Sequence, residues 1–259
     1  MEEGTGMELL PVGFGAVEAA AFIAFSYLTS AVTAAFGLGG GVMMLIAMAS
    51  VLPPLAVIPV HGAVQMGSNG GRAWVMRSHV SREIFGYFVI GSLIGAAVAS
   101  QVVVALPTDM LRLVLGLFVL WVVWAPKLTR RDAGPRSFVP IGIGTTFASM
   151  FVGATGLLIG AFLSPERLGR MTTVSTHAMC AMFQHALKIV VFGFLGFAFW
   201  EWIPLIIAMV ASGFLGTVSG KVLLERLSER VFGWAFKALL TLLAVRLIAL
   251  SAVDLLAPA

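Results

Sequence analysis

Polar side chains recur at helical spacing inside an otherwise apolar segment, residues 55–71. His61, Gln65 and Asn69 follow one another every four residues, and Arg72 comes three residues later. Side chains three or four positions apart share one face of a helix. Polar groups within a membrane span are costly and are functional candidates by default. The spacing therefore predicts a polar helix face that contacts a substrate.

A second polar face lies in the apolar segment 171–199. His177, Gln184 and Lys188 fall at intervals of seven and four residues, with His185 beside them. A single stripe of this kind usually supplies hydrogen bonds between helices, each worth about 0.6 kcal/mol. Two stripes at corresponding places in the chain favour one shared substrate cavity instead. The histidines could relay protons or serve as hydrogen-bonded packing residues.

Two glycine-rich stretches interrupt apolar sequence close to these stripes. The first contains Gly39, Gly40 and Gly41, and the second contains Thr155 and Gly156. Glycine costs about 1 kcal/mol relative to alanine inside a helix, so both stretches are predicted to break one. Broken helices with exposed N–H groups build the substrate sites of many transporters. The alternative is close packing of two helices through small residues.

Charge narrows the class of ligand. No Asp or Glu lies well inside an apolar segment, whereas Lys188 and Arg246 do. Cation pathways use buried carboxylates or rings of acid, so the pattern favours an anion or a neutral solute. Arg246 is close enough to a segment end to reach the interface. Zinc-protease, nucleophile-elbow and phosphate-loop motifs are all missing, so no enzyme activity, catalytic residue, metal or cofactor is predicted.

The elements that carry these residues are membrane helices. Of 259 residues, 59% are apolar and only 11% are charged, against about a quarter charged in soluble domains. The predicted fold class is an all-α polytopic membrane protein. Its single cysteine, Cys180, excludes an intrachain disulfide. Basic residues sit in short loops, so nucleic acid is not a partner. The expected partners are a small anion and membrane lipid, and a homodimer is left open.

Ten apolar segments are predicted, and two of them are short. The segments are 12–36, 39–52, 55–71, 83–105, 110–126, 138–151, 154–164, 171–199, 202–220 and 231–252. At 1.5 Å per residue the segments 39–52 and 154–164 reach only about 17–21 Å, less than the roughly 30 Å of hydrocarbon. Each is expected to be a half-helix or an arm of a re-entrant hairpin.

The order of segments and charges predicts an inverted repeat. Sliding the chain by about 115 residues overlays the two glycine stretches and pairs Asn69 with Gln184. It also places an acidic turn on a basic one, as inverted-topology halves would. The predicted divisions are a first half, 1–126, a cytoplasmic linker, 127–137, and a second half, 138–259. The two short segments should meet near the midplane.

Orientation follows from lysine and arginine. Twelve of the sixteen basic residues lie in four loops that the repeat puts on one side. Positive loops face the cytoplasm, so both termini are expected outside. The expected location is the plasma (inner) membrane of a bacterium.

At this point the chain resembles a known family, the TauE/SafE sulfite and organosulfonate exporters. The motifs that carry the resemblance are Ala35-Phe36-Gly37-Leu38-Gly39-Gly40-Gly41-Val42, Asn69 to Arg72, Phe183-Gln184-His185-Ala186-Leu187-Lys188 and the helix of Gly213 and Gly220. The similarity spans roughly 15–255, with Thr155 standing where the family usually has a glycine. The resemblance implies export of sulfite, sulfoacetate or a related sulfonate.

The predicted function is therefore secondary transport that exports a small sulfur-containing anion. The alternatives are uptake of such an anion, or a scaffold or enzyme subunit whose glycines only pack helices. The predicted substrate-binding residues are Gly39, Gly40, Gly41, Gln65, Asn69, Thr155, Gly156, His177, Gln184 and Lys188. In this hypothesis backbone N–H groups and amide side chains bind the anion, and Lys188 compensates its charge.

Overall fold

The chain is helical throughout the described part of a computed structural model. That part comprises residues 14–36, 39–102, 134–153, 156–163 and 165–224, with single positions at 113, 117, 120, 121, 124, 238, 241, 242, 245, 248, 249, 252 and 253. The helices are α1 (Ala16–Phe36), α2 (Gly40–Ala49), α3 (Pro54–Val75), η1 (Arg77–His79), α4 (Arg82–Val102), η2 (Pro135–Ser137), α6 (Phe138–Val152), α7 (Gly156–Ala161), α8 (Pro165–Leu168), α9 (Arg170–Phe194), η3 (Phe199–Trp202) and α10 (Ile203–Leu224). The predicted segments 110–126 and 231–252 fall largely outside the described residues, as do Thr155, Arg246 and most of the linker 127–137.

Within the described residues, four helices are long and apolar enough to cross a membrane. They cover Ala16–Ala34, Arg82–Gln101, Met171–Phe194 and Phe199–Ser219. Helix α3 has a comparable length, 22 residues, but its polar stripe makes it less apolar. The predicted all-helical membrane class is therefore confirmed.

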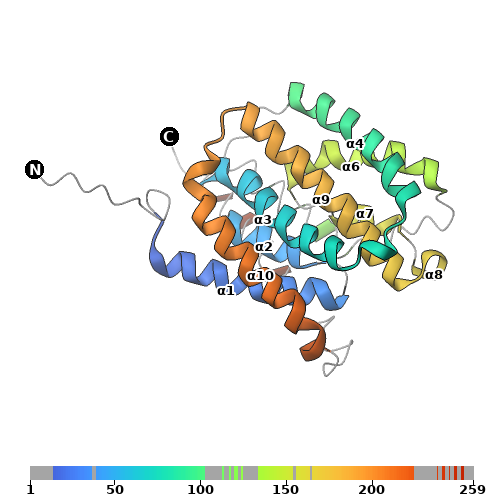
Figure 1. The fold of residues 1–259 in the computed structure, drawn as a ribbon. Coiled ribbons are helices and arrows are strands. Elements are labelled where there is room, and N and C mark those ends of the chain that lie inside the picture. Colours follow the sequence, from blue (N-terminus) through green and yellow to red (C-terminus); the bar gives the residue numbers. More distant parts are fainter. Residues whose placement is uncertain are drawn as a thin grey trace, which may run out of the picture.

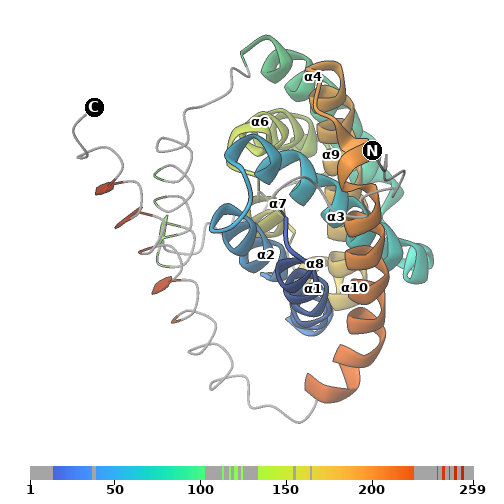
Figure 2. The same ribbon diagram turned by 90° about the vertical axis from the view of Figure 1, so that its left-hand side faces the viewer.

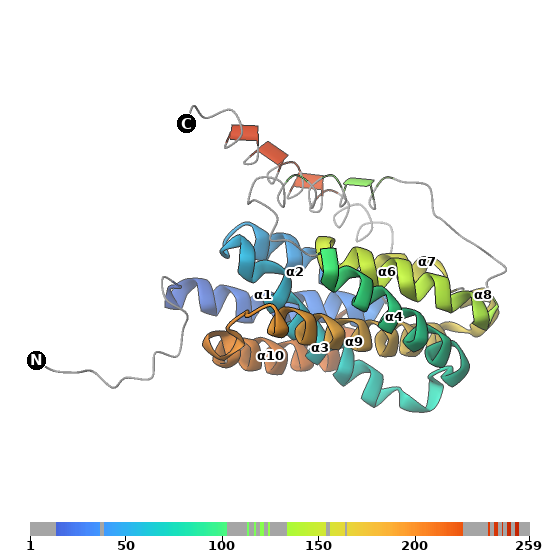
Figure 3. The same cartoon turned by 90° about the horizontal axis from the view of Figure 1, so that it is seen from above.

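Two pairs of parallel helices form the flanks of the bundle, α1 with α10 and α4 with α6 (Figure 3). Small residues let each pair approach closely. A Cβ atom on Gly91 of α4 would collide with the carbonyl oxygen of Val139, and one on Gly216 of α10 with that of Tyr27. Hydroxyl groups add to the first pair, because Ser26 Oγ donates to the Met209 carbonyl at 2.7 Å. Each flank therefore joins a helix that precedes the segment 127–137 to a helix that follows it.

The centre of the bundle is an antiparallel pair, α3 and α9 (Figure 1). Gly62 near the start of α3 faces Lys188 near the end of α9, while Gly70 faces Met182. Both central helices carry the polar stripes predicted from sequence. The α3 stripe and His177 of α9 line the space between these two helices, whereas Gln184 of α9 is turned towards α6.

Glycines stand at the start of α2 and at the end of α6, where the sequence predicted that helices would be broken. Gly39 caps the start of α2 at φ 107°, and Gly153 ends α6 at φ 83°. Residues with a Cβ atom rarely adopt such positive φ values. Helices α2 and α7, of 10 and 6 residues, are only about 15 and 9 Å long. In the view of Figure 2 both are drawn between α1 and α6, and Leu45 of α2 lies against Gly153, at the end of α6.

The connections between helices gather at two ends of the bundle (Figure 1). At one end the α3–α4 connection meets the start of α9, where the Ser81 amide donates to Thr176 Oγ1 at 2.9 Å. At the other end η3 meets the start of α1, where Trp202 packs against Phe14 with ring centroids 6.0 Å apart. Arg77 thus belongs to the first end and Glu201 to the second.

Candidate functional site

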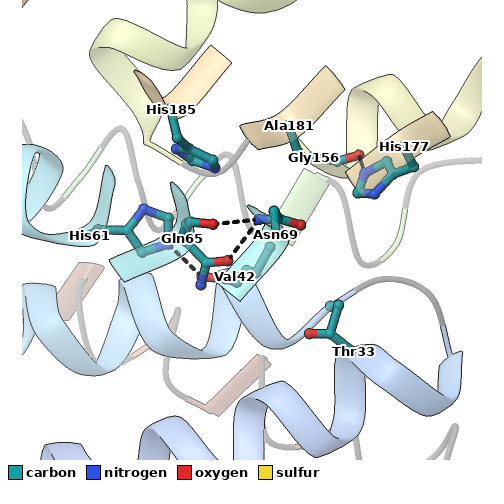
Figure 4. A pocket seen from close by; sticks show the side chains of 11 residues that line it. Thr33, Val42, His61, Gln65, Asn69, Gly156, His177, Ala181 and His185 are labelled. Atoms are coloured by element: carbon teal, nitrogen blue, oxygen red, sulfur yellow. Dashed lines mark hydrogen bonds between the residues drawn. The ribbon is translucent and has the colours of Figure 1, made fainter. Parts of the chain in front are cut away.

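A pocket lies where both glycine breaks approach the central helix pair (Figure 4). Its described lining consists of Thr33, Gly39, Gly41, Val42, His61, Gln65, Asn69, Gly156, His177, Ala181 and His185. These residues come from α1, α2, α3, α7 and α9. None of these lining residues is an Asp, Glu, Lys or Arg. The wall is therefore polar but formally uncharged while the histidines are neutral.

The α3 side of the pocket is a chain of hydrogen bonds. Asn69 Nδ2 donates to the Gln65 carbonyl at 2.9 Å and to Gln65 Oε1 at 3.3 Å. Arg72 Nη1 donates to Asn69 Oδ1 at 3.1 Å. Arg72 is only 3% exposed, and its Nε has no hydrogen-bond partner. A buried cation therefore stands directly behind the pocket wall and orients Asn69.

Two histidines contact the two glycine breaks in the same way. His61 Nε2 lies 2.9 Å from the Gly41 carbonyl oxygen, and His177 Nε2 lies 2.7 Å from that of Gly156. A carbonyl oxygen only accepts hydrogen bonds, so both Nε2 atoms carry a hydrogen. His185 lies next to His61, with ring centroids 5.7 Å apart. Figure 4 shows His61 and His185 together on one side of the pocket and His177 on the other, beside Gly156.

Six of the ten predicted binding residues line the pocket. They are Gly39, Gly41, Gln65, Asn69, Gly156 and His177. Gly40 instead packs against α1, so closely that a Cβ atom would collide with the Thr29 carbonyl and Thr33 Oγ1. Thr155 lies outside the described residues.

The remaining two predicted residues, Gln184 and Lys188, are fully buried behind the wall. Gln184 Nε2 donates to Thr145 Oγ1 at 3.3 Å and to Thr146 Oγ1 at 3.1 Å, joining α9 to α6. Lys188 Nζ donates to the Gly153 carbonyl at 2.7 Å. Cations favour the negative end of a helix dipole, and Gly153 caps the C-terminus of α6. These contacts hold the broken helix against α9.

Five lining residues were not among the predicted binding residues, although His61 and His185 were considered as proton relays or packing residues. The five are Thr33, Val42, His61, Ala181 and His185. On α9 the pocket side is the four-residue series His177, Ala181 and His185, which matches the spacing on α3. Because Ala181 is apolar, the polar pattern of α9 did not indicate this series and favoured the face of Gln184 instead.

Chemically, the site can bind a small solute but shows no catalytic arrangement. Among the described residues, no group of three or more His, Cys, Asp and Glu side chains is placed to hold a metal ion. The pocket offers amide groups, histidine rings and the start of helix α2. Helix starts favour negative ligands because their first N–H groups lack intrahelical acceptors.

Comparison with known proteins places this fold in a family. The family model for the sulfite exporter TauE/SafE matches residues 22–247, which is most of the chain. Comparison with curated proteins and with solved structures found no match. The glycine breaks and both central polar helices lie within the matched range. The chain therefore belongs to the TauE/SafE sulfite exporter family, and it is a membrane transporter of sulfur anions rather than an enzyme.

Proposed function

We propose that the protein is a secondary transporter that exports sulfite or a small organosulfonate such as sulfoacetate, and that the pocket between α3 and α9 binds this anion. The observation that carries the proposal is the convergence of both glycine breaks on one pocket with no acidic side chain in its described lining. Export, rather than uptake, follows the description of the family.

Within this pocket we assign direct contacts to the lining residues. The first N–H groups of α2 provide donors at Gly41, and Gln65 and Asn69 provide amide groups. Hydrogen bonds to a charged group contribute about 1.5–3 kcal/mol each. We assign Gln184 and Lys188 to the support of the wall, because neither lines the pocket and their donors bond instead to Thr145, Thr146 and Gly153. Thr155 stays a predicted ligand.

We further propose that the two halves are inverted repeats. Three pairs of pocket-lining residues support this, because the members of each pair are 116 positions apart in the chain. The pairs are His61 with His177, Gln65 with Ala181, and Asn69 with His185. This register replaces the sequence-based pairing of Asn69 with Gln184. The two flanking helix pairs also correspond to each other, because α1 matches α6 and α10 matches α4 in the proposed repeat. Such halves give a transporter two related arrangements around one site.

We place both termini outside the cytoplasm of a bacterial cell, in the plasma membrane. Support comes from the grouping of Arg77 with the start of α9 at one end and of Glu201 with the start of α1 at the other. Cysteines introduced at 77 and 201 should react with an impermeant thiol reagent from opposite sides of the membrane. Reaction of both from the same side would contradict the inverted repeat.

Flux through proteoliposomes tests the proposed function. Vesicles containing the purified protein should accumulate radiolabelled sulfite or sulfoacetate by counterflow faster than protein-free vesicles. Ala181→Leu should block flux because the larger leucine side chain would fill the pocket. Ala97→Leu, on the exposed face of α4, makes the same change away from the pocket and should retain flux. No flux of either anion would refute transport, and full flux in Ala181→Leu would refute this pocket as the route.

A further inference from the structure

Three histidine nitrogens in the pocket wall lack hydrogen-bond partners. They are the Nδ1 atoms of His61, His177 and His185, whose side chains are 1%, 6% and 4% exposed. Buried polar atoms in proteins are nearly always hydrogen-bonded, so each exception calls for an explanation. Three such exceptions around one pocket suggest that these atoms acquire a partner at some stage of function.

The hydrogen bonds of His61 and His177 indicate which kind of partner their Nδ1 atoms can accept. Because each Nε2–H donates to a glycine carbonyl, the neutral ring must carry a lone pair on Nδ1. A lone pair accepts a proton and cannot donate to an anion. We call His61 and His177 the carbonyl-bonded histidines. In their neutral form they add no positive charge to the pocket.

Among the described residues, the charged groups near the carbonyl-bonded histidines are Arg72 of α3 and Lys188 of α9. Arg72 donates to Asn69 and Lys188 donates to the Gly153 carbonyl, and neither lines the pocket. His185 packs against His61. The helices α2, α6 and α7 contain no titratable side chain. The carbonyl-bonded histidines and His185 are therefore the titratable groups in the described pocket wall.

We propose that the pocket binds its anion together with a proton, which Nδ1 of His61 or His177 takes up. The inference rests on the proposed function, because it requires an anionic substrate. An unpaired charge buried in this wall is unfavourable, whether it is the anion or the imidazolium. When both enter, the imidazolium offsets one negative charge of the anion, and the anion stabilises the buried imidazolium. Transport of the anion is then coupled to transport of a proton.

Nitrogen spectroscopy of the histidines reads the proposed step directly. The chain has four histidines, and the fourth, His79, is exposed in η1. Protein labelled with 15N-histidine at about pH 7.5 should show His61 and His177 as neutral rings with hydrogen on Nε2. Saturation with sulfoacetate or sulfite should convert at least one of them to the doubly protonated form. His79 should not respond to the anion and serves as an internal control.

Variants that keep the donor but cannot titrate test the coupling. Glutamine in place of histidine can still donate to the glycine carbonyl, so we choose the double variant H61Q/H177Q. Wild-type affinity for sulfoacetate, whose charge is constant in this range, should fall about tenfold per pH unit between about pH 6 and about pH 8. The double variant should vary less than about twofold. His79→Gln should retain the wild-type dependence.

The outcomes separate this inference from the proposed function. If calorimetry detects no binding of either anion, the proposed function fails, and the inference fails with it. If an anion binds while His61 and His177 stay neutral at saturation, only the inference is overturned. A pH dependence that survives in H61Q/H177Q but disappears in His185→Gln would also overturn it. If the double variant does not fold, the spectra of the wild-type protein decide alone.

Discussion

Alanine at position 91 is expected to destabilise the contact between α4 and α6. A Cβ atom there would collide with the carbonyl oxygen of Val139, so the two helices must separate. Overpacking of this kind costs about 1–3 kcal/mol, of which alanine recovers about 0.5–1 kcal/mol through its better helix propensity. Gly86 provides the matched control in the same helix, because a Cβ atom there meets nothing within 4 Å. Gly86→Ala should therefore stabilise α4 by about 0.5–1 kcal/mol.

The single cysteine provides the assay. Cys180 is fully buried and clusters with Phe88 of α4 and Phe138 of α6. A thiol-reactive dye can reach it only when these helices open, so the labelling rate reports the free energy of that opening. The two alanine variants should differ by about 1–3 kcal/mol, which corresponds to a roughly 5- to 150-fold difference in labelling rate.

Equal labelling rates in Gly91→Ala and Gly86→Ala would refute this reasoning. That result would mean that the closest approach of α4 and α6 is not at Gly91. Faster labelling in Gly86→Ala than in the wild type would contradict the assignment of that position to an open helix face.

Three further predictions concern the pocket and its supports. Gln184→Leu should destabilise the fold by about 1–3 kcal/mol because it leaves two buried hydroxyl groups without their donor. The same labelling assay measures this loss. A large loss of anion affinity with unchanged stability would instead show that Gln184 contacts the anion. Asn69→Ala should weaken anion binding about tenfold or more, as measured by calorimetry on monodisperse protein, and unchanged affinity would remove Asn69 from the site. Gly153→Ala should cost about 1–2 kcal/mol, because position 153 has φ 83° and its Cβ atom would lie 2.8 Å from Leu45 Cδ1. Gly144→Ala, in open space on the same helix, should be stabilising, so equal thermal shifts in these two variants would exclude backbone strain at 153.

The sequence predicted the helices and their interruptions well because both depend on local composition. Apolar runs set the bounds of α1, α4 and α10 to within a few residues, and clustered glycines located both breaks. The positive φ of Gly39 and Gly153 could not be assigned beforehand, since any glycine in either cluster can adopt it.

The pairing of helices and the orientation of the polar face of α9 were harder to predict. Small residues indicate that a helix packs closely, but they do not indicate which neighbour it packs against. Gln184 and His185 are adjacent in sequence, and a rotation of about one residue decides which of them faces the pocket. That rotation is set by the hydrogen bonds from Gln184 to Thr145 and Thr146, which lie nearly 40 positions earlier in the chain.

The parallel pairing of α1 with α10 also determines the order in which the molecule can be completed. Ser26 and Met209 are joined by a hydrogen bond that spans 183 positions, and Ser212 and Ile23 by one that spans 189. When α1 emerges from the ribosome, almost the whole chain must still be synthesised before its partner exists. The α4–α6 flank can form much sooner, because Ser92 and Thr146 are only 54 positions apart. If the gene is divided within the linker 127–137, each fragment should be incomplete, because each flank takes one helix from each fragment. Transport should therefore return only when both fragments are made in the same cell.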